Sequence, residues 1–353
     1  MTTPRIVVDG VGGDHGAPVV VEGALRAAEA LGVGLLLVGP EEELRREAEQ
    51  RRDAATLASL DVEYLDAQEV ITMEDPPLAA IKRKRRSSIV LGLKAVREGR
   101  GQAFFSAGNT GAVMAAATLI LRRLPGVERA ALAATLPSRT GESIVLDVGA
   151  SIEKKASHLE QFAIMGACFH QALHGAQPRV ALLSVGEEEG KGDEVIKQAH
   201  QALKEASVEF IGNIDGKQVF TGEADVIVTD GFTGNAILKT SESLMSQLVL
   251  IAKEEVGKSW MAKLGALLMA PRLRRLKKRF DHDEHGAVPL LGISAPVFIG
   301  HGSSSVRGIE SAIAVTHRFV EQRVNLAIQE QLRALAPADE PAVAGAGDGR
   351  ESA

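Results

Sequence analysis

Cysteine and aromatic residues are the scarcest components of this 353-residue sequence. There is one cysteine, Cys168, and the aromatic share is 3%, with a single tryptophan and a single tyrosine. A lone cysteine excludes an internal disulfide and any zinc site built from several cysteines. The shortage of aromatic rings argues against recognition of nucleobases or sugars by stacking.

A basic surplus is also absent. Lysine and arginine number 40 against 46 acidic residues, a formal net charge of −6, which argues against a dedicated nucleic-acid-binding protein. Apolar residues make up 45% and charged residues 24%, so the chain has ample material for a core and is not disordered as a whole. No long apolar stretch followed by a cleavage site opens the sequence, and we expect a cytoplasmic protein.

Strand-like and helix-like runs alternate through most of the chain, which predicts an α/β fold with mainly parallel sheets covered on both faces. The expected strands are residues 5–9, 35–38, 62–65, 103–106, 131–136, 143–148, 180–185, 208–211, 226–229 and 297–299. The expected helices are 17–31, 41–60, 112–123, 156–173, 192–206, 234–256 and 305–334. We expect one catalytic unit over residues 1–335 and a disordered tail over 336–353, which lacks hydrophobic periodicity.

Glycines follow directly on many of the expected strands. Examples are Gly10, Gly108, Gly149, Gly186 and Gly231. In open α/β sheets ligands lie outside the carboxyl ends of the strands, and a following helix offers free N–H groups to an anion. Any single glycine is ordinary turn chemistry, but several such loops together predict one composite anion site.

Two familiar nucleotide-binding motifs fail. Gly10 and Gly12 fit the first positions of the dinucleotide fingerprint, but its third glycine position falls on His15. Residues 186–192 are one residue too short for a Walker loop, and no serine or threonine follows Lys191. Nicotinamide and nucleoside-triphosphate chemistry therefore lose their main support.

No metal site is predicted either. His170 and His174 are four residues apart but lack the glutamate of a zinc-binding helix, so a solvated helix face explains them better. Residues 281–285 are dense in histidine and acid, which a polar loop also explains. Cys168 lies within an apolar pattern and is interpreted as a small buried hydrophobic residue rather than a nucleophile.

Four polar loops remain, and their order and spacing are specific. They read D-G-V-G-G-D (9–14), S-A-G-N-T-G-A (106–112), G-E-E-E-G-K-G (186–192) and D-G-F-T-G-N (230–235), with H-G-S-S following at 301–304. With L-D-V-G-A (146–150) and Q-F-A-I-M-G (161–166), the chain resembles the phosphate acyltransferase family of bacterial phospholipid synthesis over roughly residues 5 to 335.

The resemblance implies transfer of a fatty acyl group from acyl carrier protein to inorganic phosphate, giving acyl phosphate. It implies a fold similar to phosphotransacetylases and isocitrate dehydrogenases, with a cleft between two lobes, a homodimer, and no metal or organic cofactor. The alternatives are a phosphotransacetylase using acyl-coenzyme A, a non-catalytic membrane-associated scaffold, and a decarboxylating dehydrogenase of similar fold. Acyl chain length, physiological direction and the microscopic acid and base stay open.

Catalytic roles fall on four residues of the loops that carry the resemblance. Lys191, between two glycines, is placed to bind phosphate as a point charge; the alternative is a solvated lysine balancing residues 187–189. Asp230 either positions a donor, acts as a base or caps a turn. Asn235 donates hydrogen bonds, and His301 could protonate the departing thiolate.

The remaining loop residues are assigned to substrate and phosphate binding. They are Asp9, Gly12, Gly13, Asp14, Ser106, Asn109, Thr110, Gly111, Gly192, Thr233 and Ser303. Residues 109–111 open a helix after a strand, so their backbone amides form a natural phosphate cradle. The alternative for Asp9 and Asp14 is that they only hold the first glycine loop in shape.

Two basic segments interrupt the acidic average. The first, in an expected helical stretch, is Lys82, Arg83, Lys84, Arg85 and Arg86. It is interpreted either as a solvated face or, since the resemblance supplies an acidic partner, as a docking site for acyl carrier protein.

The second basic segment, residues 257–280, holds eight lysines and arginines and no acid. Its pattern predicts two short amphipathic helices joined near residues 269–271 that contact an anionic membrane surface; the alternative is packing against a dimer mate. The resemblance favours peripheral association with the inner face of the cell membrane. The expected membrane-contact residues are Trp260, Met261, Leu264, Leu267, Leu268, Arg274, Lys277 and Lys278.

Overall fold

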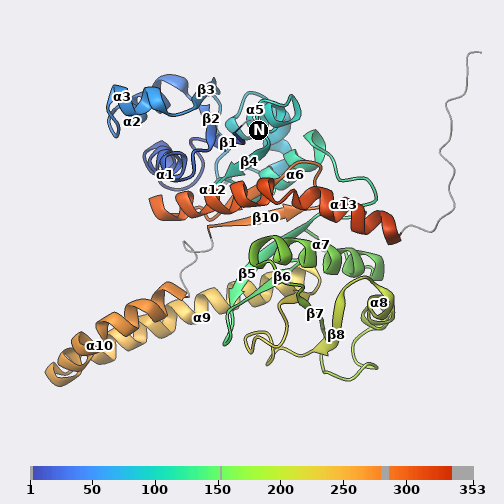
Figure 1. Cartoon of the computed structure of the whole chain (residues 1–353). Coiled ribbons are helices and arrows are strands. Elements are labelled where there is room, and N and C mark those ends of the chain that lie inside the picture. Colours follow the sequence, from blue (N-terminus) through green and yellow to red (C-terminus); the bar gives the residue numbers. More distant parts are fainter. Residues whose placement is uncertain (1–2, 152, 280–285, 336–353) are drawn as a thin grey trace, which may run out of the picture.

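The computed structural model describes residues 3–151, 153–279 and 286–335 (Figure 1). The strands are β1 (Arg5–Asp9), β2 (Gly34–Gly39), β3 (Val62–Asp66), β4 (Ala103–Ser106), β5 (Ala131–Pro137), β6 (Glu142–Leu146), β7 (Arg179–Leu183), β8 (Glu209–Ile214), β9 (Val226–Val228), β10 (Ala287–Leu291) and β11 (Val297–Gly300). The helices are α1 (Gly16–Leu31), α2 (Glu41–Glu49), α3 (Ala54–Ser59), α4 (Pro77–Arg83), α5 (Ser88–Arg97), α6 (Thr110–Ile120), α7 (Ala156–His174), α8 (Glu194–Glu205), α9 (Gly231–Gly257), α10 (Trp260–Arg279), α12 (Val306–Glu321) and α13 (Val324–Leu335).

All these strands join one sheet, in the order β3-β2-β1-β4-β11-β10-β5-β6-β9-β7-β8. Two groups of neighbouring strands are parallel. The first strand group is β3, β2, β1, β4 and β11, and the second strand group is β6, β9, β7 and β8. β10 and β5 are antiparallel to their neighbours and link the two groups. The predicted α/β class with mainly parallel strands is confirmed.

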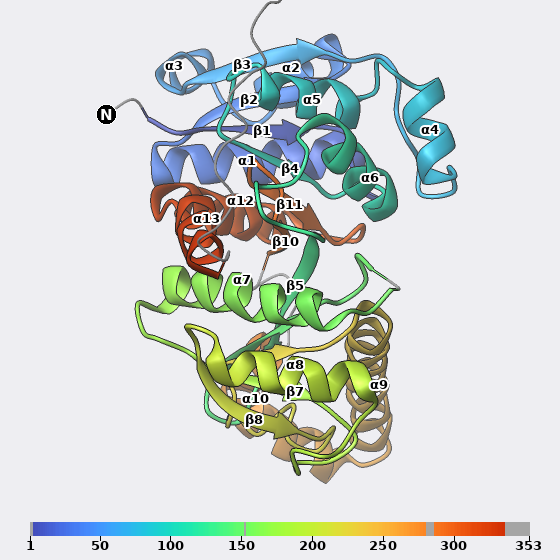
Figure 2. The ribbon, with the colours of Figure 1, turned by 90° about the vertical axis from the view of Figure 1, so that its right-hand side faces the viewer.

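The sheet twists between its two ends. The three antiparallel pairings set the two strand groups in opposite directions along the ladder. Neighbouring strands rotate by roughly 20–25° each, so the rotation accumulates across a sheet of this width. In Figure 2, β1 and β8 consequently both run toward the side of the molecule on which α6 and α9 lie. Loops after strands of both groups therefore open on a common side.

Helices cover both faces of the sheet, as the continuous apolar strands predict. One core cluster packs α1, α2, α7, α8, α12 and α13 against the sheet, and the other packs α4, α5 and α6 against the opposite face. α1 and α12 approach closely at Gly23, where an added Cβ would lie 2.6 Å from Ile309 Cβ. These rigid layers hold the strand ends, and hence the polar loops, in place.

β10 was not among the expected strands. Its sequence, AVPLL, contains Pro289, which cannot donate to a ladder and argues against a central strand. In the structure Pro289 lies opposite Phe298 of β11, whereas β10 pairs with β5 only through Leu290 and Leu291. Pro289 thus lies in the part of β10 that pairs with β11 alone, so it does not interrupt the ladder between β10 and β5.

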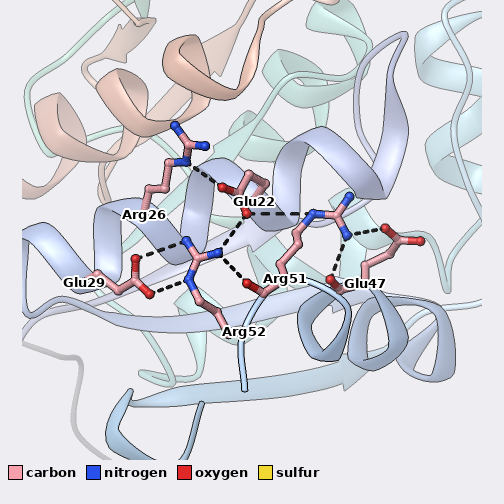
Figure 3. A network of polar contacts seen from close by, with 6 residues as sticks. All are labelled: Glu22, Arg26, Glu29, Glu47, Arg51 and Arg52. Carbon is pink, nitrogen blue, oxygen red and sulfur yellow. Dashed lines mark hydrogen bonds and ion pairs between the residues drawn. The ribbon is translucent and has the colours of Figure 1, made fainter. Parts of the chain in front are cut away.

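Two expected helices are each split in two. Residues 41–60 form α2 and α3, because Asp53 accepts a hydrogen bond from Thr56 N and starts a new helix. Residues 305–334 form α12 and α13, which are separated where Arg323 adopts a positive φ of 52°. The bend after α2 is tied to α1 by an ion-pair network of Glu22, Arg26, Glu29, Glu47, Arg51 and Arg52 (Figure 3).

The second basic segment differs from its expected form. A break near residues 269–271 was expected, but α10 continues through Pro271 and pairs with α9 in a hairpin that projects from the body (Figure 1). Proline removes one helical hydrogen bond, to the carbonyl of Leu267. Because Leu267 is exposed, water can satisfy that carbonyl. Among the described residues, no helix is long and apolar enough to cross a membrane.

The first basic segment is not within one helix. α4 ends at Arg83, and Ser87 caps the start of α5 by accepting from Val90 N at 3.4 Å. Lys84 turns inward and pairs with Asp75 at 2.5 Å. The other four basic side chains of this segment are exposed, two in the last turn of α4 and two in the turn that follows it.

Candidate functional site

The first loop group lies at the carboxyl ends of β1 and β4, around the buried Asp9. Ser106 Oγ donates to Asp9 Oδ2 at 2.7 Å, and Gly108 N donates to Ser106 Oγ at 3.0 Å. Burial raises the pKa of Asp9, while hydrogen bonds from Ser88 and Ser106 act in the opposite direction. Asp9 and Ser106 therefore join two loops from within, and neither side chain is exposed to a ligand.

The glycines of the first loop allow close contact between loops. An added Cβ at Gly12 would lie 2.7 Å from Asp9 Oδ2. Gly13 has a φ of +87°, and an added Cβ there would lie 2.9 Å from Gly302 O. Asp14 N donates to the same carbonyl, Gly302 O, at 2.7 Å. The 9–14 and 301–304 loops thus pack backbone to backbone, which excludes larger residues at these positions.

Asn109 uses its whole side chain within the protein. Its Oδ1 accepts from Ala112 N at 3.0 Å and so caps α6. Its Nδ2 lies within hydrogen-bond distance of three backbone carbonyls, those of Thr72 at 3.0 Å, Met73 at 3.3 Å and Asp75 at 3.2 Å. Asn109 is therefore a clamp between α6 and the segment before α4, and the phosphate cradle expected here rests on backbone amides.

Those amides belong to the first turn of α6. Thr110 is exposed and Gly111 is half-buried. An added Cβ at Gly111 would lie 2.7 Å from Pro77 Cγ, so α4 covers one side of this helix start. A helix N-terminus with N–H groups pointing outward favours an anion.

His301 and Ser303 lie exposed at the end of β11. Ser303 N donates to His301 Nδ1 at 3.3 Å, and the Ser303 hydroxyl lies 2.8 Å from the same nitrogen. A neutral imidazole whose Nδ1 accepts carries its proton on Nε2. The ring is thus held in the tautomer that presents an N–H hydrogen-bond donor at Nε2.

The second loop group lies at the carboxyl ends of β7 and β9. Asp230 caps α9: its carboxylate accepts from Thr233 N at 3.0 Å and from Thr233 Oγ1 at 2.8 Å. Lys191 is exposed, and its N–H donates to Glu188 O at 2.9 Å. Gly192 has a φ of +96°, and an added Cβ would lie 2.7 Å from Ile196. Of the alternatives for Asp230, the contacts correspond to the cap.

Lys154 was not identified in the sequence. Its Nζ lies 2.6 Å from Asp193 Oδ2 and 4.0 Å from Asp230 Oδ2. Asp193 caps α8 by accepting from Ile196 N at 3.0 Å. One half-buried lysine thus bridges the residues that start α8 and α9. No local motif marks Lys154, because its partners lie 39 and 76 residues away in the chain.

Asp147 was noted only as part of a motif, yet it organises this group. It is fully buried and accepts from Leu132 N, Gly149 N, Ala150 N, and from Ser151 N and Oγ. The start of α9 packs directly on this loop, since an added Cβ at Gly234 would lie 1.9 Å from Asp147 O. The nearest atom to an added Cβ at Gly149 is Asn235 Oδ1, at 3.7 Å, which places Asn235 beside the same loop.

The structure therefore collects the site residues in two groups. Each group is held by its own contacts at the carboxyl ends of one strand group, and the two open on the same side of the molecule (Figure 2). A surface hollow of about 580 Å³ lies elsewhere, between α2, α3 and β3. The first basic segment begins at the end of α4, which packs against α6, and the start of α9 belongs to the second loop group, whereas α10 lies on the projecting part of the hairpin (Figure 1).

The expected membrane residues lie on α10. Trp260, Met261, Leu264, Leu267 and Leu268 are all exposed. The side chains of Arg274, Lys277 and Lys278 lie outside the described part of the structure.

Two sets of residues were considered as metal ligands in the sequence, the pair His170 and His174 and residues 281–285. Among the described residues there is no group of three or more histidine, cysteine, aspartate or glutamate side chains placed to hold a metal ion. His170 and His174 have ring centroids 4.4 Å apart, and residues 281–285 lie outside the described residues.

Comparisons with known proteins give a consistent result. Residues 4–327 match a family described as "Fatty acid synthesis protein". The phosphate acyltransferase of Heliobacterium modesticaldum is 46% identical over 332 residues, 93% of this chain and 97% of that protein. That of Pelotomaculum thermopropionicum is 44% identical over 321 residues, 91% of this chain and 92% of that protein.

Solved structures with a similar fold are more distant in sequence. A phosphotransacetylase from Streptococcus pyogenes superposes with a TM-score of 0.61 at 17% identity, covering 90% of this chain and 93% of that one. A branched-chain phosphotransacylase from Enterococcus faecalis gives a TM-score of 0.57 at 13% identity, covering 90% and 99%. These two likenesses establish the architecture alone.

Proposed function

The chain belongs to the phosphate acyltransferase family, and from this premise we propose that it transfers a long-chain fatty acyl group from acyl carrier protein to inorganic phosphate. Membership makes it an acyltransferase of fatty acid and phospholipid synthesis. The observation that carries the finer proposal is the pair of polar loop groups, one at the start of α6 and the other at the starts of α8 and α9, which open on the same side of the molecule (Figure 2). The products are acyl phosphate and free carrier protein.

The reaction is written as direct phosphorolysis across a cleft between the two loop groups. A phosphate oxygen attacks the thioester carbonyl carbon, the C–S bond breaks, and the sulfur leaves with a proton. Backbone amides at Thr110 and Gly111 and the Lys191 ammonium hold the phosphate. Asn235 stabilises the developing oxyanion, at a few kcal/mol for a well-placed donor, whereas the N–H and the hydroxyl of Thr233 are both held by Asp230. The sulfur takes up the proton that the attacking hydrogen phosphate loses, and the His301 Nε2–H donates a hydrogen bond to the departing sulfur.

The remaining residues of the two groups shape the site. Asp9 and Ser106 join the 9–14 and 106–112 loops, and Asn109 clamps the start of α6. Asp230 positions Thr233, and Lys154 ties Asp230 to the start of α8. In this scheme Asp230 acts through the residues it holds and takes no proton.

No acyl-enzyme is proposed. Burial raises the pKa of the Cys168 thiol to about 11, so the only cysteine is a poor nucleophile. Trapping a covalent acyl-enzyme during turnover, for example as a mass adduct after acid quenching, contradicts the direct route. An unmodified protein mass throughout turnover supports it.

Apolar side chains beside the polar loops favour a long acyl chain over an acetyl group. Val185 and Phe232 are 82% and 74% exposed, and they follow the neighbouring strands β7 and β9. Exposed bulky apolar groups at strand ends suit an apolar ligand. An acetyl group offers almost no surface for such a contact.

The first basic segment is proposed to bind the acidic carrier protein. Lys82, Arg83, Arg85 and Arg86 are exposed at one turn, which suits electrostatic steering; Lys84 is held by Asp75. Changing the four exposed residues to glutamate should slow association with acyl carrier protein and leave turnover of acyl-coenzyme A, if any, unchanged. Equal association rates at low salt contradict this role.

The α9–α10 hairpin is proposed to serve a homodimer and an anionic membrane surface. It exposes apolar residues on both helices, among them Leu248 and Ile251 on α9 and Leu267 and Leu268 on α10. Lysines and arginines flank the apolar residues of α10 and suit anionic lipid headgroups. The enzyme would then act in the cytoplasm at the inner face of the membrane.

One experiment tests the function. Purified protein is mixed with phosphate and long-chain acyl carrier protein, and acyl phosphate and freed carrier protein are measured beside reactions with long-chain acyl-coenzyme A and acetyl-coenzyme A. Product with the carrier protein supports the proposal, whereas product only with acetyl-coenzyme A favours a phosphotransacetylase. Lys191→Ala should raise the KM for phosphate, and Lys197→Ala, a change of an exposed lysine on α8, should not. Phosphate kinetics unchanged in Lys191→Ala refute its assignment.

A further inference from the structure

A buried polar pair lies behind the loop that carries Lys191. His200 on α8 is 4% exposed and Asn213 on β8 is 6% exposed, and His200 Nδ1 lies 2.9 Å from Asn213 Oδ1. The His200 ring meets Phe210 edge-on, with centroids 5.1 Å apart, which restricts its rotation. Burying a polar group costs free energy unless the group is hydrogen-bonded. We therefore expect the remaining hydrogen-bonding atoms of this pair to have a partner.

That partner is the backbone of the 186–192 loop, which carries Lys191. Asn213 Nδ2 donates to Glu188 O at 3.1 Å, and Lys191 N donates to the same carbonyl at 2.9 Å. Because the amide nitrogen of Asn213 donates to Glu188 O, its oxygen must accept from His200, and His200 Nδ1 therefore carries the proton. The imidazole, the amide, the carbonyl and the Lys191 N–H form one continuous chain of hydrogen bonds.

A second tether holds the outer side of the same loop. Glu189 Oε1 accepts from Lys204 Nζ at 2.6 Å and from Gln201 Nε2 at 2.5 Å. Hydrogen bonds from Lys204 and then Gln201 lower the pKa of Glu189. This contact is exposed to solvent and screened by salt, so it contributes little to the position of the loop. The buried chain operates in a low dielectric, where each hydrogen bond counts for more.

We propose that His200 and Asn213 are positioning residues for Lys191: they fix the backbone of the 186–192 loop so that its ammonium meets the phosphate. The inference rests on the function proposed above and deepens it. Neither side chain touches a substrate. The loop contains Gly186, Gly190 and Gly192, which leave its backbone free to move, so its position depends on what holds it. A purely structural link between α8 and β8 would leave phosphate binding unchanged.

The test compares His200→Leu with His200→Asn. Leucine removes the N–H donor, whereas the asparagine amide can present an N–H near the position of Nδ1. His200→Leu should raise the KM for phosphate about tenfold, the effect of losing roughly one net hydrogen bond, with a smaller change in the KM for the acyl donor. His200→Asn should restore the phosphate KM to within about twofold, a difference well under 1 kcal/mol. Gln201→Ala, which removes only one of the two exposed contacts to Glu189, is the matched control and should resemble the wild type.

A second readout does not use activity. Amide hydrogen exchange at Lys191 reports the hydrogen bond to Glu188 directly, and it should become faster in His200→Leu and in Asn213→Asp, whose new oxygen faces the carbonyl. If Lys191→Ala loses phosphate use while His200→Leu keeps a wild-type phosphate KM and Lys191 exchange, the inference is wrong and the proposed function stands. If neither the wild type nor any variant yields acyl phosphate, the proposed function is wrong. In that case, amide exchange at Lys191 that is unchanged in both His200→Leu and Asn213→Asp shows that the positioning role is wrong as well.

Discussion

Asn109 offers the sharpest quantitative test of how the first loop group is built. Asn109→Ala removes two different contributions. The helix cap to Ala112 N is worth about 1 kcal/mol. The Nδ2 group has two hydrogens shared among the carbonyls of Thr72, Met73 and Asp75, and two such hydrogen bonds are worth about 1 kcal/mol each. Asn109 is 7% exposed, so water replaces little of this, and the expected loss in unfolding free energy is about 3 kcal/mol.

Urea unfolding, followed by circular dichroism, measures that loss. Asp53→Ala is the control, since Asp53 caps α3 by accepting from Thr56 N at 2.8 Å and holds no distant segment. Asn109→Asp separates the two contributions: it keeps the cap, but it directs a carboxylate oxygen at three carbonyls. We expect Asn109→Asp to destabilise the protein and to raise the KM for phosphate, because the segment before α4 is released from α6.

Two results would refute this reasoning. If Asn109→Ala costs no more than Asp53→Ala, the amide group does not hold the segment before α4. If Asn109→Asp is as stable as the wild type, the three carbonyl contacts carry no energy, and Asn109 is a helix cap alone.

Three further predictions concern other parts of the molecule. Changing Leu267 and Leu268 to glutamate should abolish binding to anionic liposomes in a flotation assay; retained binding by an intact dimer contradicts the membrane role. Phe232→Ser should raise the KM for a long-chain acyl donor more than that for a short-chain one, and an equal effect on both would exclude an acyl contact. Burial lowers the pKa of His158 and His170, in His170 with a further contribution from a neighbouring histidine. The unfolded chain therefore binds protons first, so unfolding free energy should fall as pH drops below about 6.5. The double change to glutamine should flatten this fall, and an unaltered pH profile would count against it.

Local pattern was sufficient for most of the strand–loop–helix units. Short apolar runs followed by glycine and polar residues marked β1, β4, β7 and β9, and each is followed by the loop expected. Two features that were missed lacked a local signal: β10 carries Pro289, and α12 ends where Arg323, with neither glycine nor proline beside it, takes a positive φ. In both cases tertiary packing overrides the preference of the residue.

The proposed site residues divide in the same way. Lys191, Asp230 and His301 were predicted because glycine-rich loops and the family resemblance point to them. Lys154 and Asp147 were not assigned roles, because what they do depends on partners that only the folded sheet brings near.

By itself, the sequence determined the α/β class, the family and the positions of the polar loops proposed as the site, because these depend on residue type and short-range order. Only the tertiary structure decided which loop residues are available to a ligand: Asp9, Ser106 and Asn109 hold the protein together, whereas the α6 amides and Lys191 are placed at its surface. The physical reason is that a hydrogen-bonding group can serve the fold or the ligand, and the partner it finds is set by residues distant in the chain. The scarce cysteine follows the same rule, since its place in the fold, and not its presence in the sequence, raises the pKa of its thiol.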